Sequence, residues 1–287
     1  MPDKTLRRLH PAVRDDIGDL LTQRPLPGAR VSQIDPFLFL NHHGPQTYAP
    51  HNRGLPFGPH PHRGFETVTF ILEGELAHQD SAGHESIIRA GGVQLMTAGS
   101  GIVHAEVSPR SFREHGGPLE ILQLWVNLPG RLKMCPPAYT GLQREAIPAL
   151  ALDDGKAMLK LIAGQWDGHS GPIAPLTDVF MSTIELRAGA RIRLTGLEAR
   201  NVLLYVVRGA VQIGPDYAEA LHLAELSDSG DAIELGASID SVVLFGHAPP
   251  IGEPVVAHGP FVMNTRAEIN QAIVDYQAGR FGAPLPG

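Results

Sequence analysis

The sequence predicts an all-β protein that contains two tandem β-barrels and a C-terminal α-helix. Short apolar runs alternate with glycine, proline and polar turns along most of the chain, which is typical of barrels and sandwiches. Residues 69–78 and 204–213 share one pattern, an apolar strand, a charged residue, a glycine and a second strand. This offset of 135 residues indicates an internal repeat. A helical period is found only near the C-terminus.

The first repeat is expected to begin after an opening segment, residues 1–35, in which charges and prolines surround short strands. A buried strand at 37–40 is followed by a turn at 41–45. A tight turn at 73–75 divides the run 65–80 into two strands. Further strands are predicted at residues 86–89, 93–97 and 119–128.

The second repeat is predicted to follow a proline-rich connector on the surface. Its strands are expected at residues 157–163, 178–186, 190–194, 202–207, 210–213, 232–235 and 241–245. The domain boundaries that we predict are 1–130 for the first barrel, 131–155 for the connector, 156–248 for the second barrel and 249–287 for the C-terminal tail.

The helix is predicted over about residues 265–279. Thr265 and Glu268 have the spacing of a capping box. Apolar residues then follow at positions i, i+3, i+4 and i+7, which gives a helix one apolar stripe. The stripe consists of Ile269, Ala272, Ile273 and Tyr276. We expect it to cover part of a barrel.

Composition excludes several classes of protein. With 43% apolar and 18% charged residues, the 287-residue chain has the balance of a globular protein. Its net charge of −7 and its lack of a Lys/Arg run argue against direct nucleic-acid binding. The single cysteine, Cys135, excludes an intramolecular disulfide framework and Cys-based metal sites. No apolar run is long enough to span a bilayer, and no secretory h-region is visible. We therefore expect a monomer in the cytoplasm, or in the nucleus if the source is eukaryotic.

Two pairs of potential metal ligands lie between residues 58 and 108. His60 and His62 form one pair, and His104 and Glu106 form the other, each at i, i+2 spacing. Side chains at this spacing on a strand point to the same face. Pro61 favours an extended conformation for the residue that precedes it. Two such pairs on neighbouring strands would place three imidazoles and one carboxylate around one point.

This donor set suits a divalent first-row metal. Four protein ligands on an ion that prefers six leave two positions for water, O₂ or a chelating substrate. Fe(II) fits this arrangement best, with Mn, Co, Ni and Cu as alternatives. Zinc needs only four ligands and is less favoured, although it can occupy a purified sample.

Other polar residues have simpler interpretations. His78 and Asp80 also have i, i+2 spacing, but they flank a turn, and we interpret them as a structural pair at the rim of the barrel. Glu66 has the same face parity as the histidine pair, and we expect it to orient an imidazole rather than to bind the metal. When the repeat offset is applied to the four ligands, they map onto residues that lack metal-binding side chains: Thr195, Leu197, Ile239 and Ser241. The second barrel is therefore expected to be metal-free.

Four stretches resemble the pirin family of bicupins. They are His60-Pro-His-Arg-Gly-Phe-Glu-Thr-Val68, Met96-Thr-Ala-Gly-x-Gly-Ile-x-His-x-Glu106, Leu124-Trp-Val-Asn-Leu-Pro129 and Gly259-Pro-Phe-Val-Met-Asn-Thr265. The resemblance implies two tandem cupin (jelly-roll) β-barrels, with iron in the N-terminal barrel. In the family three histidines and a glutamate hold the iron, and they match His60, His62, His104 and Glu106. The glutamate that matches Glu66 is not a ligand in that pattern.

The sequence departs from the family pattern in two places. Gly91-Gly-Val-Gln-Leu95 stands where Gly-Asp-Val-Gln-Trp is common, and Asn41-His-His43 stands where Asp-His-Phe is common. Both changes leave the four matched ligands intact. They affect the expected packing near the site and the shape of its cavity, and therefore the identity of the substrate.

The resemblance also implies a reaction. Several pirins act as quercetin 2,3-dioxygenases, which open the central ring of a flavonol with O₂ and release carbon monoxide. Glu106 or a metal-bound hydroxide is then expected to help deprotonate the 3-hydroxyl group, while Phe57 and Met96 are candidate walls for a small aromatic substrate. The alternative is an iron-dependent, redox-sensitive co-regulator that binds a protein partner without physiological turnover.

Overall fold

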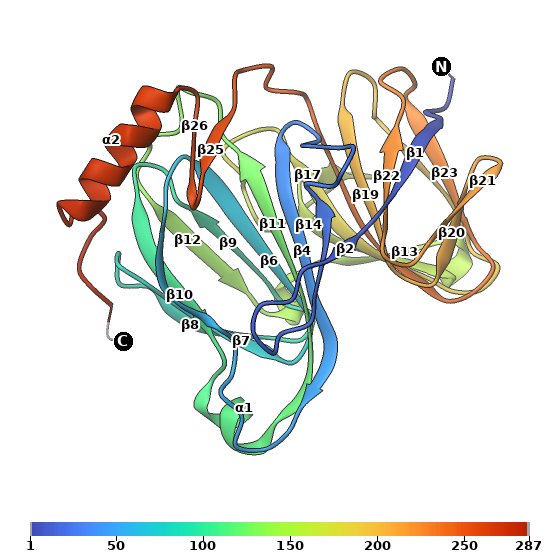
Figure 1. Ribbon diagram of the computed structural model, residues 1–287. Helices are drawn as coiled ribbons and strands as arrows, with labels where there is room; N and C mark the ends of the chain where they lie inside the picture. The colour runs from blue at the N-terminus through green and yellow to red at the C-terminus, as the bar shows by residue number, and fades with distance from the viewer. Residues whose placement is uncertain (1, 286–287) are drawn as a thin grey trace. The chain divides into compact units, whose positions relative to one another are not determined.

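The protein consists of two antiparallel β-barrels and a C-terminal helix (Figure 1). The structure is a computed structural model that describes residues 2–285. Each barrel combines a seven-stranded sheet with a four-stranded sheet. The predicted all-β fold with two barrels and a C-terminal helix is confirmed.

The first barrel carries both predicted ligand pairs. Its four-stranded sheet runs in the order β5 (Phe57–His62), β10 (Ile102–Val107), β7 (Glu75–Asp80) and β8 (Glu85–Arg89). Its seven-stranded sheet runs in the order β12 (Ala138–Leu142), β9 (Val93–Thr97), β6 (Phe65–Glu73), β11 (Gly117–Asn127), β4 (Phe37–Tyr48), β3 (Thr22–Leu26) and β2 (Val13–Arg14). A short helix, α1 (Arg110–His115), joins β10 to β11.

The second barrel has the same pair of sheets. Its four-stranded sheet runs in the order β18 (Arg191–Thr195), β23 (Ala232–Ala237), β20 (Ala210–Ile213) and β21 (Asp216–Glu219). The seven-stranded order is β1 (Leu6–Pro11), β22 (His222–Leu226), β19 (Asn201–Arg208), β24 (Ser241–Ala248), β17 (Phe180–Leu186), β14 (Ala157–Ala163) and β13 (Ala149–Leu152). A separate hairpin pairs β15 (Gln165–Trp166) with β16 (His169–Ser170).

The internal repeat is visible in the strand order. Strands β6 and β7 are each third in the order of their sheets, and β19 and β20 occupy the same places in the second barrel. Gly74 and Gly209 connect these strand pairs with φ angles of +84° and +79°. Glycine adopts such angles at little cost, which explains why it recurs at this turn.

The two copies of the repeat differ in the side chains that fill the barrel interior. Strands β18 and β23 of the second barrel correspond to β5 and β10 of the first. On them Ile192 lies opposite Leu235, and both side chains are buried in the barrel core. Leu194 and Ile233 form the next buried pair. The strands that carry histidines in the first barrel therefore carry packed aliphatic side chains in the second.

Some local predictions need correction. The turn predicted at residues 41–45 does not form, because β4 continues through it. The stretch expected to be a connector contains strands β12 and β13 and two 3₁₀ helices, η1 (Arg144–Ala146) and η2 (Asp153–Gly155). Each strand adds to the edge of a sheet, β12 beside β9 and β13 beside β14. Prolines in this stretch fall outside the paired segments, which is compatible with edge strands.

The chain divides into two compact units that each combine distant segments. One consists of Met1–Val13, Arg24–Leu38 and Ala146–Pro250, and the other of Arg14–Gln23, Phe39–Glu145 and Ile251–Gly287. The N-terminal strand β1 belongs with the second barrel because it pairs with β22. The predicted boundaries assign consecutive stretches of the chain to each barrel, whereas each compact unit contains segments that are distant in sequence. They remain a prediction.

The C-terminal segment lies in the same unit as the first barrel. Strands β25 (Val256–His258) and β26 (Phe261–Met263) form a hairpin beside helix α2 (Arg266–Gln277) (Figure 1). Ile269 and Ala272 are buried as predicted, but Tyr276 is 40% exposed and Asp275 is buried instead. Arg63 accounts for this burial, because its guanidinium donates to the Asp275 carboxylate over 2.8 Å. No helix between residues 2 and 285 has the length and apolar character needed to cross a membrane.

The capping box at the start of α2 gives a first prediction. Thr265 Oγ1 accepts from the Glu268 amide, and the Glu268 carboxylate accepts from the Thr265 amide. Thr265→Ala removes the first of these bonds and should lower the free energy of unfolding by about 1 kcal/mol. Equilibrium urea unfolding measures the change. Arg266→Ala, next to the box, is the control, and equal effects of the two substitutions would contradict the prediction.

Candidate metal centre

Three imidazoles converge between two neighbouring strands of the first barrel. Strands β5 and β10 pair antiparallel, with His60 directly opposite His104. His62 lies two residues from His60 and therefore points to the same side. The Nε2 atoms of His60 and His104 are 3.0 Å apart, and one nitrogen from each of the three rings lies within 4.8 Å of the others. Both His62 and His104 are buried, whereas His60 is partly exposed.

The outer nitrogen of two of these rings is held by the backbone. His60 Nδ1 is 2.8 Å from the Gly58 carbonyl oxygen, and His62 Nδ1 is 3.3 Å from the Pro260 carbonyl oxygen. A carbonyl accepts only, so each Nδ1 carries a proton, and the Nε2 atoms are the nitrogens available to bind a metal. The corresponding Nδ1 of His104 is buried and has no hydrogen-bond partner among residues 2–285.

The electrostatics favour neutral imidazoles. Burial, reinforced by the electrostatic influence of the neighbouring His60, lowers the pKa of His62 to about 3. Burial and the neighbouring histidines lower the pKa of His104 well below its usual value. Nitrogen lone pairs 3.0 Å apart repel unless a proton or a cation lies between them. The contact between the Nε2 atoms of His60 and His104 therefore holds one shared proton. A divalent metal fits this set of converging nitrogens, and its binding would displace that proton.

Glu106 faces the barrel interior but belongs to a different set of contacts. Its Oε1 accepts from Thr69 Oγ1 at 2.9 Å and from Gln94 Nε2 at 2.6 Å, and its Oε2 accepts from Gln123 Nε2 at 2.5 Å. The three donors lie on β6, β9 and β11, so the carboxylate links the two sheets. It lies outside the group of three imidazoles. Because Oε2 has a single donor, a lone pair remains for a metal or a proton.

Glu66 does not contact an imidazole among the described residues. Its carboxylate accepts from Thr97 Oγ1 at 2.7 Å. Thr69 lies three residues along the same strand and reaches Glu106, so Glu66 points to the opposite face of the sheet. Burial raises the pKa of Glu66 to about 7, although the Thr97 hydrogen bond opposes the shift. The expected orienting contact is therefore absent.

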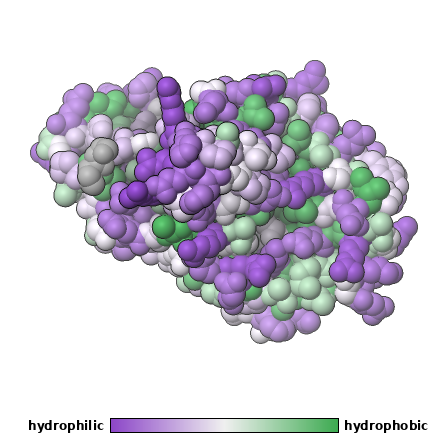
Figure 2. All heavy atoms as spheres, turned by 90° about the horizontal axis from the view of Figure 1, so that it is seen from below, coloured by the Kyte–Doolittle hydropathy of each residue, from purple (hydrophilic) through white to green (hydrophobic). Residues whose placement is uncertain are grey.

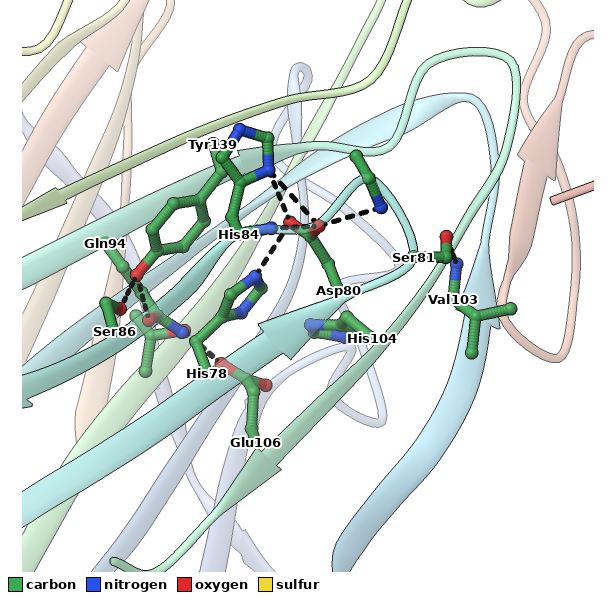
Figure 3. A network of polar contacts seen from close by, with 12 residues as sticks. His78, Asp80, Ser81, His84, Ser86, Gln94, Val103, His104, Glu106 and Tyr139 are labelled. Carbon is green, nitrogen blue, oxygen red and sulfur yellow. Dashed lines mark hydrogen bonds and ion pairs between the residues drawn. The ribbon is translucent and has the colours of Figure 1, made fainter. Parts of the chain in front are cut away.

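The pair His78 and Asp80 is buried, and Asp80 ends strand β7 beside the turn that the sequence predicts. The two residues are 1% and 3% exposed. Strand β7 pairs with β10, which places Asp80 opposite His104. The His78 and His104 ring centroids are 5.5 Å apart, and His78 lies between Tyr139 and His104 in Figure 3. The sequence signal for this pair was the same i, i+2 spacing that marks the metal ligands.

The two candidate wall residues lie in different environments. Phe57 is half-buried, packs against the apolar core of the first barrel, and lies 5.2 Å from the His43 ring, centroid to centroid. Met96 is fully buried and packs with Ala98 and Ile102. Their role as walls for a substrate remains a proposal.

The sequence pattern does not predict the aromatic group that lies next to His62. The Trp125 ring centroid is 5.4 Å from His62, 4.4 Å from Phe65 and 4.6 Å from Phe39. Trp125 Nε1 is buried and has no hydrogen-bond partner among residues 2–285. Parity along β11 could have identified it, since Trp125 lies two residues from Gln123, which contacts Glu106.

The raised pKa of Glu66 gives a second prediction. Between pH 4.5 and 7 the unfolded chain releases this proton while the folded protein retains it, so wild-type stability falls as the pH rises. Glu66→Gln removes this titration. The free energy of unfolding of the variant, relative to wild type, should therefore rise by about 3 kcal/mol from pH 4 to pH 8. Urea unfolding of both proteins across this range measures it. The histidines titrate in both proteins and cancel, so a difference that does not change with pH would contradict the prediction.

Comparison with known proteins places the chain in a family. Residues 19–126 match the pirin family and residues 181–282 match the pirin C-terminal cupin domain. A Pseudomonas aeruginosa protein named "Putative quercetin 2,3-dioxygenase" is 40% identical over 248 residues, which are 86% of this chain and 87% of the relative. The crystal structure of a quercetin 2,3-dioxygenase from Acinetobacter baumannii superposes with a TM-score of 0.93 at 36% identity and covers 99% of this chain and 100% of that one.

A more distant structure shares the fold. The bacterial pirin YhhW of Escherichia coli, solved in complex with nickel(II), superposes with a TM-score of 0.68 at 24% identity and covers 85% of this chain and 99% of that one. The matches to the family and to the P. aeruginosa relative extend across both barrels. This chain belongs to the pirin family.

Proposed function

We propose that this protein is a metal-dependent dioxygenase that opens the ring of flavonols such as quercetin with O₂. The observation that carries the proposal is the convergence of three imidazoles, with one nitrogen from each within 4.8 Å of the others, on the inner face of the first barrel. The similarity to the A. baumannii quercetin 2,3-dioxygenase over nearly the whole chain supports the same reaction class. The partners in this proposal are a small aromatic substrate and O₂.

His60, His62 and His104 would hold the metal through their Nε2 atoms, with Glu106 as the fourth ligand. Imidazole nitrogens and one carboxylate suit Fe(II), which we propose as the native ion, with Mn, Co, Ni, Cu and Zn as alternatives. When bound, such an ion supplies Lewis acidity at a substrate oxygen and a redox connection between substrate and O₂.

Glu106 is also the group that can accept a proton from the substrate. Its Oε1 has two donors and its Oε2 has one, so Oε2 retains a free lone pair. This lone pair serves either the metal or a proton, so Glu106 would take the proton of the flavonol 3-hydroxyl group only while Oε2 is not bound to the metal, which leaves an anionic substrate oxygen. Gln94 and Gln123 keep the carboxylate in place from two strands while the proton moves. A catalytic base must lie within hydrogen-bond distance of the proton that it removes, and this geometric requirement comes before any requirement on its pKa.

The aromatic group beside His62 can orient a planar substrate. Trp125 and Phe39 are partly exposed, and their rings would stack with the rings of a flavonol, whereas Phe65 is fully buried and packs against Trp125. The unpartnered Trp125 Nε1 can donate to a substrate oxygen. Phe57 and Met96 stay as further candidates for walls.

The first test is metal analysis of freshly purified protein, followed by anaerobic reconstitution with Fe(II) and a flavonol assay. We expect oxygen-dependent loss of quercetin absorbance together with release of carbon monoxide.

His62→Ala should reduce both metal content and turnover. Turnover should fall by about 100-fold or more, because removing a metal ligand has a larger effect than removing a residue that only hydrogen-bonds to a ligand. Glu106→Gln keeps the shape but cannot take the proton, and kcat should fall by about 10²- to 10⁴-fold.

His115→Ala is the matched control, because His115 is an exposed histidine on α1. It should leave metal content and turnover unchanged. A fully metal-loaded protein that leaves quercetin and related flavonols untouched would contradict the enzymatic proposal. That outcome would favour the alternative, a redox-sensitive protein that binds a partner without turnover. On the face seen in Figure 2, hydrophobic residues are scattered among hydrophilic ones, which does not single out a docking surface there.

A further inference from the structure

Two neighbouring buried imidazoles each have one nitrogen without a hydrogen-bond partner among residues 2–285. Of the three converging histidines, only His104 has an outer nitrogen, Nδ1, that no described residue binds. Nδ1 of His78 is likewise buried and unpartnered. The two ring centroids are 5.5 Å apart at an interplanar angle of 51°. Buried polar atoms are nearly always hydrogen-bonded in native proteins, so this coincidence calls for an explanation.

Asp80 determines which nitrogen of His78 carries the proton. The Asp80 carboxylate accepts from the backbone amides of Ala82 at 2.9 Å and His84 at 3.1 Å. Its Oδ2 is 3.0 Å from His78 Nε2. An ionised carboxylate can only accept, so Nε2 of His78 is the donor and Nδ1 keeps its lone pair. Asp80 therefore makes the free nitrogen of His78 an acceptor.

Packing fixes the plane of the His78 ring. Tyr139 stacks on it at a centroid distance of 4.1 Å and an interplanar angle of 14°. The Tyr139 hydroxyl is held in turn by Ser86 and by Gln94, whose amide donates to Glu106 (Figure 3). The His78 side chain is therefore set between a rigid aromatic ring and the candidate metal centre.

The two unpartnered nitrogens are chemically complementary. Once Nε2 of His104 binds a metal, its proton must reside on Nδ1, which becomes a donor. Histidines that bind metals generally donate this second N–H to an acceptor, which fixes the ring and raises its basicity as a ligand. His60 and His62 use backbone carbonyls for this purpose.

We propose that His78 is the positioning residue for His104, accepting its Nδ1–H directly or through one water, with Asp80 setting the required tautomer. No hydrogen bond joins the two Nδ1 atoms in this structure, so the contact would form through rotation of the His104 ring or through one bridging water. This inference rests on the proposed metal site but adds residues that bind neither metal nor substrate. The series Asp80, His78, His104 then runs from a surface turn to the metal.

The test measures Co(II) binding to the full-length protein by competition titration, together with the visible spectrum of the Co(II) form and the melting temperature of the metal-free protein. His78→Leu removes the acceptor, and Asp80→Asn donates to Nε2 and forces the His78 proton onto Nδ1. Both should weaken Co(II) binding by about 10- to 100-fold and shift the spectrum. His78→Asn retains an acceptor near the Nδ1 position and should lose less than about tenfold.

His247→Leu is the matched control. His247 is also a buried histidine stacked on an aromatic ring, Phe180, at 4.7 Å and 6°, but it lies in the second barrel. It should lower the melting temperature as His78→Leu does and leave Co(II) binding unchanged. If His78→Leu does not fold, the Co(II) affinities of Asp80→Asn and His78→Asn are compared instead, and the proposal requires the greater loss in Asp80→Asn.

Three outcomes would overturn the inference. One is wild-type affinity in Asp80→Asn, another is an equal loss in His78→Asn and His78→Leu, and the third is an equal loss in the His247→Leu control. Failure of the wild-type protein to bind Co(II), Fe(II) or any other tested first-row metal would instead refute the proposed metal centre itself. The two failures are therefore distinguishable.

Discussion

The site depends on one pairing, His60 opposite His104 on strands β5 and β10. An antiparallel register at this position brings two Nε2 atoms to 3.0 Å and leaves room for the third imidazole two residues away. Burial lowers the pKa of His62 and of His104, which keeps these two rings neutral. The His60–His104 contact is held by one shared proton in this structure, and metal binding would displace that proton, so the affinity for metal should rise with pH.

The second barrel shows how the same fold fills its interior when the two strands carry no histidines. Its corresponding strands pair Ile192 with Leu235 and bury both among aliphatic side chains. Such a core is stabilised by apolar burial and contributes no ligating atoms. The first barrel uses its interior differently, because Thr69, Gln94 and Gln123 surround the Glu106 carboxylate there. One architecture therefore supports a packed core in one barrel and a polar site in the other.

Local patterns predicted the histidine pairs, the internal repeat and the capped helix, because each depends on residues close in sequence. The burial of His78 depends on β7 pairing with β10, a long-range register that spacing alone does not reveal. Glu66 was assigned to the wrong face because residues 63 and 64 interrupt the strands, with Gly64 at φ +89°, so parity cannot be counted across them. Trp125 was seen as part of a motif, but its place beside His62 comes only from the packing of the barrel.

Anomalous diffraction from crystals loaded anaerobically with Fe(II) tests the central claim most directly. Data collected on both sides of the iron absorption edge locate the ion without reference to activity. We expect one peak in the first barrel, bonded to the Nε2 atoms of His60, His62 and His104, with Glu106 completing the protein ligands. A peak held by other residues, or a loaded protein whose three imidazoles surround no peak, would contradict the account.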